Sequence, residues 1–176
     1  MMREYVTLGA VLPTYFEQIY GWCTAPEVAQ TWRYRGSTPS PETFAHDLWQ
    51  GVLCQYLAYD TSSGEPVGLV SLYDANLASR RAFVSCLIAP AWHSTGVATE
   101  AMRLILRHGF DSWPLDKVYM ETNSFAIQAF QSAIRVGIFV EEARLVDFET
   151  FGTGTSDLIY LSVSRSDFRQ IDSIDR

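Results

Sequence analysis

The sequence has little positive charge and little cysteine. Lysine and arginine together number 13 against 20 aspartates and glutamates, and the formal net charge is -7. Affinity for nucleic acid depends largely on basic side chains that contact phosphates, so we expect no nucleic-acid partner. Cys23, Cys54 and Cys86 form no C-x-x-C pair. This scatter argues against a disulfide framework and a zinc ribbon, and we expect no bound metal.

Long apolar runs are also missing. No segment approaches the roughly 18 apolar residues that a membrane-spanning helix needs, and residues 1–5 lack the apolar run of a signal peptide. We therefore expect a cytoplasmic protein with no membrane partner. Neither a repeat nor a linker divides the 176 residues. We expect a single domain over residues 1–165 and a polar, frayed tail over residues 166–176.

The order of the predicted elements indicates a mixed α/β fold. Period-2 and apolar runs predict strands at residues 5–8, 55–59, 66–73, 82–89, 117–121, 138–149 and 157–164. Short helices are expected from Pro13 and Pro26, and longer ones at 41–50, 97–110 and 126–136. The apolar run 82–89 is typical of a strand buried on both faces. This order predicts a mixed, mostly antiparallel sheet with helices on both faces.

The segment LIAPAWHSTGVATE, residues 87–100, carries the most functional information. A buried strand ends at Pro90, and a short loop containing Gly96 leads into an amphipathic helix. The first turn of a helix leaves N–H groups unpaired and carries positive partial charge, so this loop could hold a pyrophosphate without a lysine. The alternative is that Gly96 serves only the geometry of the turn.

The same loop resembles the Arg/Gln-x-x-Gly-x-Gly/Ala signature of the GNAT superfamily of N-acetyltransferases. The resemblance runs over nearly the whole chain and looks closest to the branch that acetylates ribosomal-protein N-termini. It implies a GNAT-like acyl-CoA-binding domain, a splayed sheet whose gap accepts pantetheine, acetyl-CoA as co-substrate, and a small-molecule amine or a peptide N-terminus as acceptor. It implies a cofactor site made of Cys86, Leu87, Ile88, His93, Ser94, Thr95, Gly96, Val97, Ala98 and Thr99.

By the same resemblance, Glu121 lies where many members of the branch carry a general base. A carboxylate can take the ammonium proton, directly or through water, before the amine attacks the thioester carbonyl, which typically contributes about 10²- to 10⁴-fold in rate. The alternative is a solvated or salt-bridged strand residue. Trp32, Arg33 and Tyr34 fall where family members place an acceptor-binding loop, and they are the candidate substrate-binding residues.

The sequence departs from the family pattern at several positions. His93 stands in place of arginine or glutamine, and Ser94 in place of a glycine. The asparagine that commonly contacts the cofactor falls at Ala126, and the tyrosine that commonly protonates the leaving thiolate falls at Ala133. Ser124 and Ser132 could protonate the thiolate through a water; the alternative is that they are helix-surface or capping serines. Two other functions stay open for this reason: a CoA-thioester-binding protein with little or no transfer, and a transferase for a larger acyl group. The oligomeric state also stays open, with a homodimer as one arrangement.

Overall fold

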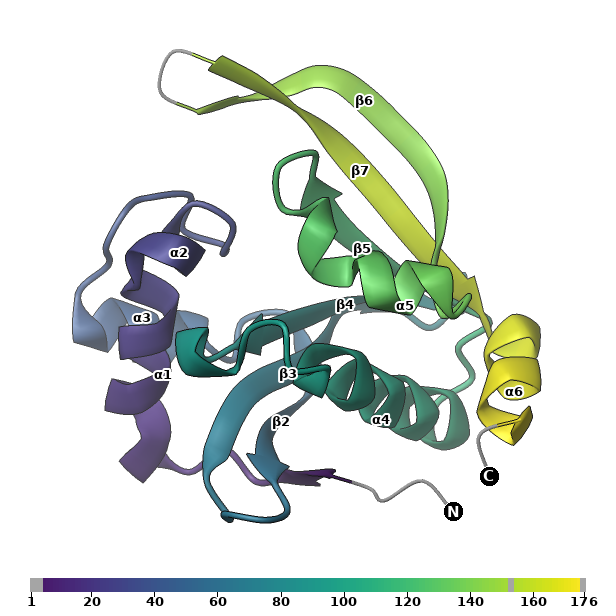
Figure 1. Cartoon of the computed structure of the whole chain (residues 1–176), viewed down its shortest axis with the longest axis horizontal. Coiled ribbons are helices and arrows are strands. Elements are labelled where there is room, and N and C mark those ends of the chain that lie inside the picture. The colour runs from purple at the N-terminus through teal and green to yellow at the C-terminus, as the bar shows by residue number, and fades with distance from the viewer. Residues whose placement is uncertain (1–4, 152–153, 175–176) are drawn as a thin grey trace.

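A computed structural model of the chain describes residues 5–151 and 154–174 (Figure 1). Its strands are β1 (Val6–Gly9), β2 (Val52–Asp60), β3 (Pro66–Asn76), β4 (Arg81–Ile88), β5 (Lys117–Asn123), β6 (Val140–Phe151) and β7 (Gly154–Ser164). Its α-helices are α1 (Phe16–Thr24), α2 (Pro26–Ala29), α3 (Pro41–Asp47), α4 (Val97–Ser112), α5 (Gln131–Arg135) and α6 (Arg165–Ile174). Short 3₁₀ turns cover Pro13–Tyr15, Pro90–Trp92 and Ile127–Phe130.

The strands form one seven-stranded sheet with the order β1-β2-β3-β4-β5-β7-β6. Every neighbouring pair in the described residues is antiparallel except β4 and β5, which are parallel. The predicted mixed, mostly antiparallel sheet is therefore confirmed. The long β6–β7 arm projects from the body of the molecule at the far edge (Figure 1).

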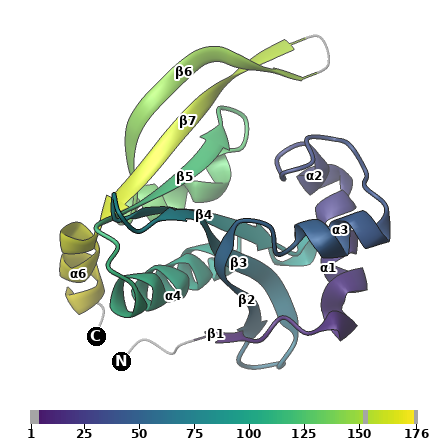
Figure 2. The ribbon, with the colours of Figure 1, turned by 180° about the vertical axis from the view of Figure 1, so that it is seen from behind.

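The sheet splays open between β4 and β5. The two strands pair only from Arg81 opposite Lys117 to Phe83 opposite Tyr119. Beyond this point β4 stays with β3 as far as Ile88, while β5 follows β7 as far as Asn123 (Figure 2). Among the described residues, the facing edges of β4 and β5 beyond this point have no strand neighbour. The splayed sheet implied by the resemblance is therefore confirmed.

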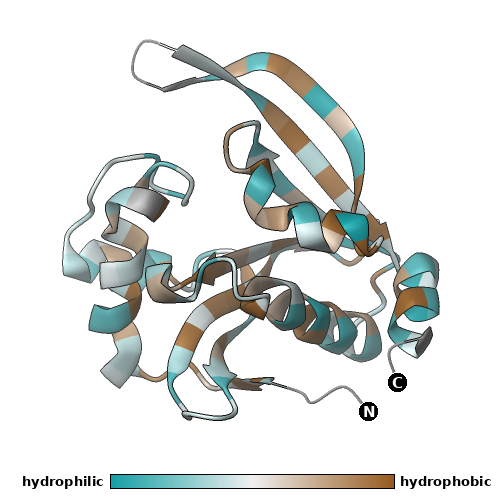
Figure 3. Ribbon diagram, viewed as in Figure 1, coloured by the Kyte–Doolittle hydropathy of each residue, from teal (hydrophilic) through white to brown (hydrophobic). Residues whose placement is uncertain are grey.

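Helices cover the two faces of the sheet unequally. Helices α4, α5 and α6 contribute to the main core through buried residues such as Met102, Ala133 and Phe168. Helices α1, α2 and α3 form a second core against Leu57, Leu69 and Leu87, on the opposite face of β2, β3 and β4. Apolar residues gather on the strands and polar residues on the outer turns of α4 and α6 (Figure 3). The half of the second face that belongs to β5 and β7 lies outside this second core.

Two predictions about burial and order are wrong. The C-terminal segment is helix α6 and not a frayed tail, because Phe168 packs its ring 5.5 Å from that of Phe110 and Asp172 is buried with the arginines of α4. Strand β4 is not buried on both faces along its length. Phe83 and Ser85 are half-buried, since they lie on the face that α1–α3 cover only in part.

Other local predictions hold with small changes. The hydroxyl of Ser40 accepts a hydrogen bond from the Thr43 amide at 3.2 Å, as expected of an N-cap before Pro41. The predicted helix at 126–136 starts as the 3₁₀ turn Ile127–Phe130 before α5, and it ends at Gly137 with φ +81°. The hairpin glycine expected at Gly152 lies outside the described residues.

Candidate active site

The loop before α4 is shaped by two residues with left-handed backbone. Ser94 has φ +62° and Gly96 has φ +90°. The carbonyl of Gly96 accepts hydrogen bonds from the Tyr5 hydroxyl and from the Glu100 amide, both at 3.2 Å. Helix α4 starts at Val97, so the amides of Val97, Ala98 and Thr99, which precede Glu100, have no acceptor within the helix. These amides form a fixed set of donors that suits a pyrophosphate.

His93 turns back onto the sheet. Its Nε2 atom lies 3.0 Å from the carbonyl oxygen of Ile88, to which the ring nitrogen donates. No local sequence pattern indicates this contact. It ties the start of the loop to the last residue of β4.

The segment Cys86–Ile88 lines the open side of β4. One edge of this segment pairs with Val70, Leu69 and Gly68 of β3, and the other edge faces the splay. Burial raises the pKa of the Cys86 thiol to about 12, so the thiol stays protonated and unreactive at neutral pH. The segment can therefore bind a ligand through its backbone N–H and C=O groups, and not through the thiol.

Glu121 lies on the β5 side of the splay and is exposed. It stands opposite Tyr160 of β7, and the carboxylate and the phenol interact. Burial raises the pKa of Tyr160, and the hydrogen bond and the negative charge of Glu121 raise it further. Burial and the same carboxylate also raise the pKa of Tyr73 on β3. Glu121 is therefore set among neutral phenols beside the gap.

Glu121 and the start of α4 belong to opposite faces of the sheet. Phe83, opposite Tyr119, lies on the face of β4 that carries Leu87, and Glu121 is on the same face of β5 as Tyr119. The rings of Tyr73, Phe83 and Tyr119 form a ladder across three strands, with centroids 5.7 Å apart at each step. Two ligands could thus enter the splay from opposite sides.

The predicted acceptor loop makes contacts within the protein. Trp32 is 7% exposed in the second core, and its indole N–H has no partner among the described residues. Arg33 Nη1 donates to the carbonyl oxygen of Asp47 at 2.7 Å, and the Tyr34 hydroxyl donates to the Asp47 carboxylate at 3.4 Å. Arg35, which is not among the predicted site residues, forms an ion pair with Glu149 of β6. No local signal marks this pair, because 114 residues separate its members.

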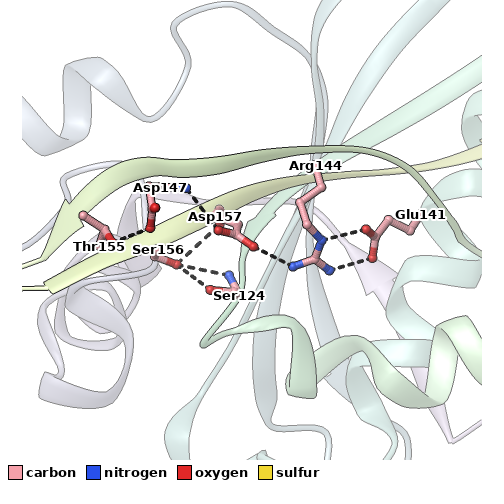
Figure 4. A network of polar contacts seen from close by, with 7 residues as sticks. All are labelled: Ser124, Glu141, Arg144, Asp147, Thr155, Ser156 and Asp157. Atoms are coloured by element: carbon pink, nitrogen blue, oxygen red, sulfur yellow. Dashed lines mark hydrogen bonds and ion pairs between the residues drawn. The ribbon is translucent and has the colours of Figure 1, made fainter.

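The two serines proposed for thiolate protonation differ in their surroundings. Ser124 shares a hydrogen bond with Ser156 at 2.9 Å, in a network that also holds Arg144 between Glu141 and Asp157 (Figure 4). Its role is to fix the end of β5 to the β6–β7 arm.

Ser132 instead lies 2.7 Å from the Thr99 hydroxyl, at the start of α4. Ala133 is 1% exposed in the main core. The position that the resemblance assigned to the tyrosine thus points away from the surface of α5.

Comparison with known proteins assigns the family. Residues 6–137 match the model of the acetyltransferase (GNAT) domain, which is three-quarters of the 176 residues. The chain belongs to the GNAT family. Spermidine N(1)-acetyltransferase of Escherichia coli K12 is 32% identical over 85 residues, 48% of this chain and 46% of that enzyme. The chain thus matches about half the length of this curated relative.

Solved structures of GNAT proteins agree in fold. Spermidine N-acetyltransferase from Vibrio cholerae, in complex with CoA and spermine, superposes with a TM-score of 0.81 at 20% identity, covering 95% of this chain and 99% of that one. A chimera of the Vibrio cholerae enzyme and hSSAT gives 0.79 at 20% identity over 94% and 98%. These matches are to spermidine acetyltransferases and give no specific support to the ribosomal-protein branch.

The described residues, 5–151 and 154–174, contain neither a candidate membrane span nor a candidate metal cluster. None of its helices is both long and apolar enough to cross a membrane. Within the same residues, no three histidine, cysteine or acidic side chains are grouped closely enough to hold a metal ion.

Proposed function

We propose that this GNAT protein transfers the acetyl group of acetyl-CoA to a primary amine by direct attack of the amine on the thioester. The observation that carries the proposal is the splay between β4 and β5, which has the N-terminus of a 16-residue helix on one face and the carboxylate of Glu121 on the other. An anionic cofactor can therefore approach the gap from one face of the sheet, and a cationic acceptor from the other.

The donor side fits acetyl-CoA. The pyrophosphate would lie against the loop from His93 to Thr99, where the amides of the first turn of α4 supply donors despite the net charge of -7. Pantetheine would follow the free edge of Cys86–Ile88 as an added strand would, through main-chain hydrogen bonds. When bound, acetyl-CoA supplies the activated acyl group, and the protein needs only to hold and polarise it.

On the acceptor side, Glu121 acts as the general base. Its carboxylate takes a proton from the ammonium, and the freed nitrogen attacks the thioester carbonyl carbon. The C–N bond forms and the C–S bond breaks, and the second proton of the nitrogen passes to the sulfur, so that CoA leaves as the free thiol. The Tyr160 phenol, opposite Glu121 on β7, flanks the carboxylate.

The acceptor is a small cationic amine. The spermidine acetyltransferases among the relatives support a polyamine, and the negative charge of the protein favours the approach of a cation. The loop that holds Trp32, Arg33 and Tyr34 forms one wall of the entrance, with Asp47 fixing its shape. Use of acetyl-CoA fits a cytoplasmic location.

The test is release of free thiol from acetyl-CoA with a panel of primary amines. We expect stimulation by di- and polyamines. The variant Glu121→Gln should lose about 10²- to 10⁴-fold in kcat while binding of CoA, measured by calorimetry, is unchanged. The matched control is Glu142→Gln, since Glu142 lies on β6 and pairs with Lys117 at the closed end of the splay, with Oε2 2.6 Å from Nζ.

The same assay separates the alternatives. Binding of CoA with no amine-stimulated release would identify a CoA-thioester-binding protein. Release with longer acyl-CoA but not with acetyl-CoA would identify a transferase for a larger acyl group. Absence of CoA binding would refute the proposal.

A further inference from the structure

An arginine of the protein itself lies beside the proposed acceptor site. The guanidinium of Arg35 forms an ion pair with Glu149 of β6. The Glu149 side chain is only 10% exposed, whereas that of Arg35 is 45% exposed. The pair joins the loop between α2 and α3 to the β6–β7 arm, which reaches out over that side of the molecule (Figure 1).

The backbone of the loop is bent to make this contact. Arg35 has φ +49° and Gly36 has φ +84°. A left-handed conformation is unfavourable for arginine and persists only where neighbouring contacts hold it. The amide of Arg35 donates to the carbonyl of Trp32 at 2.9 Å, and that of Gly36 donates to the carbonyl of Ala29 at 2.8 Å. The loop thus presents Arg35 in a fixed, strained position.

Glu149 is close to the catalytic carboxylate. Asn123 Nδ2 donates to Glu149 Oε2 at 3.4 Å, and Asn123 follows Glu121 by two residues on the same face of β5. Two residues along a strand span roughly 7 Å. The negative charges of both Glu121 and Glu149 act on Tyr160. The two carboxylates therefore border one polar region.

Asn123 supplies a second group that can accept from a cation. The residue is 4% exposed, and its Oδ1 atom has no partner among the described residues. A buried amide oxygen without a donor is unfavourable, and an ammonium group carries three donors. An ammonium beside Glu149 could satisfy both Asn123 and the carboxylate.

We propose that Glu149 is a specificity-determining residue that binds a second positively charged nitrogen of the acceptor, and that Arg35 occupies its carboxylate until such an acceptor displaces it. This inference rests on the proposed transfer to an amine at Glu121. When a diamine binds, its second ammonium group replaces the Arg35 guanidinium at Glu149, so the carboxylate is never left unpaired. A monoamine cannot make this exchange, and Arg35 stays in place.

The test compares butylamine with 1,4-diaminobutane and spermidine in the acetyl-transfer assay. Wild-type protein should prefer the diamine and spermidine. Glu149→Gln should lower kcat/KM for these two acceptors by about ten- to a hundredfold, the worth of a hydrogen bond to a charged group, and should leave butylamine within about twofold. Arg35→Gln should lower KM for 1,4-diaminobutane, because the competing cation is gone. Glu142→Gln, on the same strand, should not alter the preference.

The outcomes distinguish this inference from the proposed function. Equal losses for butylamine and 1,4-diaminobutane in Glu149→Gln would overturn it, as would a raised KM for the diamine in Arg35→Gln, which would indicate a purely structural ion pair. Wild-type protein that acetylates both amines without preference would keep the transferase function and reject the role of Glu149. Wild-type protein that acetylates none would reject both. Circular dichroism melting confirms that each variant is folded.

Discussion

Helix α6 is tied to α4 by buried charges, and this contact gives a quantitative prediction. Asp172 is 6% exposed and accepts from Arg103 Nη1 at 3.3 Å and from Arg107 Nε and Nη2 at 3.0 and 2.6 Å. Arg103 also donates two hydrogen bonds to Glu100, in the first turn of α4. The perturbation is Asp172→Asn, which removes the charge and keeps the shape.

The expected loss follows from these contacts. Removal of one partner of a buried ion pair typically destabilises a protein by about 3–5 kcal/mol. Arg103 keeps Glu100, and the Arg107 side chain is 21% exposed and can reach water. The asparagine also keeps one acceptor oxygen. We therefore expect a loss of about 2–3 kcal/mol in the free energy of unfolding, a large part of the total of about 5–15 kcal/mol for a domain.

The assay is urea denaturation followed by tryptophan fluorescence and circular dichroism. With a slope of about 2 kcal/mol/M, the midpoint should fall by about 1–1.5 M. The control is Asp111→Asn, an exposed site on α4, for which we expect a change within about 0.5 kcal/mol. If Asp172→Asn unfolds at the same urea concentration as Asp111→Asn, the buried network does not hold α6 in place.

Three further predictions concern single positions. Ser94→Gly removes the strain of a left-handed serine, worth roughly 1 kcal/mol, but the glycine also makes the unfolded chain more flexible, which costs about as much. Tm should therefore move by no more than about 3 °C, and a larger fall would reveal an unseen role for the hydroxyl. The Arg144 guanidinium, and next the Asp147 amide, hold the pKa of Asp157 below its usual range. The stabilising effect of the Asp157 carboxylate is therefore complete above about pH 4 and is lost as pH falls through the lowered pKa. The Tm difference between wild type and Asp157→Asn should shrink in acid, and a difference that stays constant in a pH series would contradict this. Ser132→Ala should raise KM for acetyl-CoA severalfold with kcat unchanged, since it removes a contact to Thr99 at the start of α4, whereas a lowered kcat alone would place Ser132 at the thioester.

Local patterns predicted much of the fold. The apolar repeat over residues 97–110 and the Ser40-Pro41 start gave the positions of α4 and α3, because these signals depend on neighbours in the sequence. The C-terminal helix α6 was not predicted, because its polar outer face resembles that of an unstructured tail. What orders it is a set of partners on α4, among them Phe110 and Arg103, more than 55 residues earlier in the chain.

The candidate site was predictable only where the chemistry is local. The loop around Gly96 is predicted from its own residues and Glu121 from a resemblance that runs over nearly the whole chain, and both stay predictions. The resemblance assigns the tyrosine position to Ala133, which is buried in the main core, a fact that the sequence pattern alone does not contain. The Arg35–Glu149 pair depends on how the arm folds over the loop, and no spacing rule contains that information.

In the proposed mechanism, an amine attacks acetyl-CoA directly within the splay. The most direct test is the initial rate measured while acetyl-CoA and 1,4-diaminobutane are varied together, with the acetylated amine and free CoA quantified by mass spectrometry. Direct attack predicts intersecting double-reciprocal lines, which require both substrates on the protein at once, and one acetylated amine for each CoA released. Parallel lines, or CoA released without acetylated amine, would contradict it.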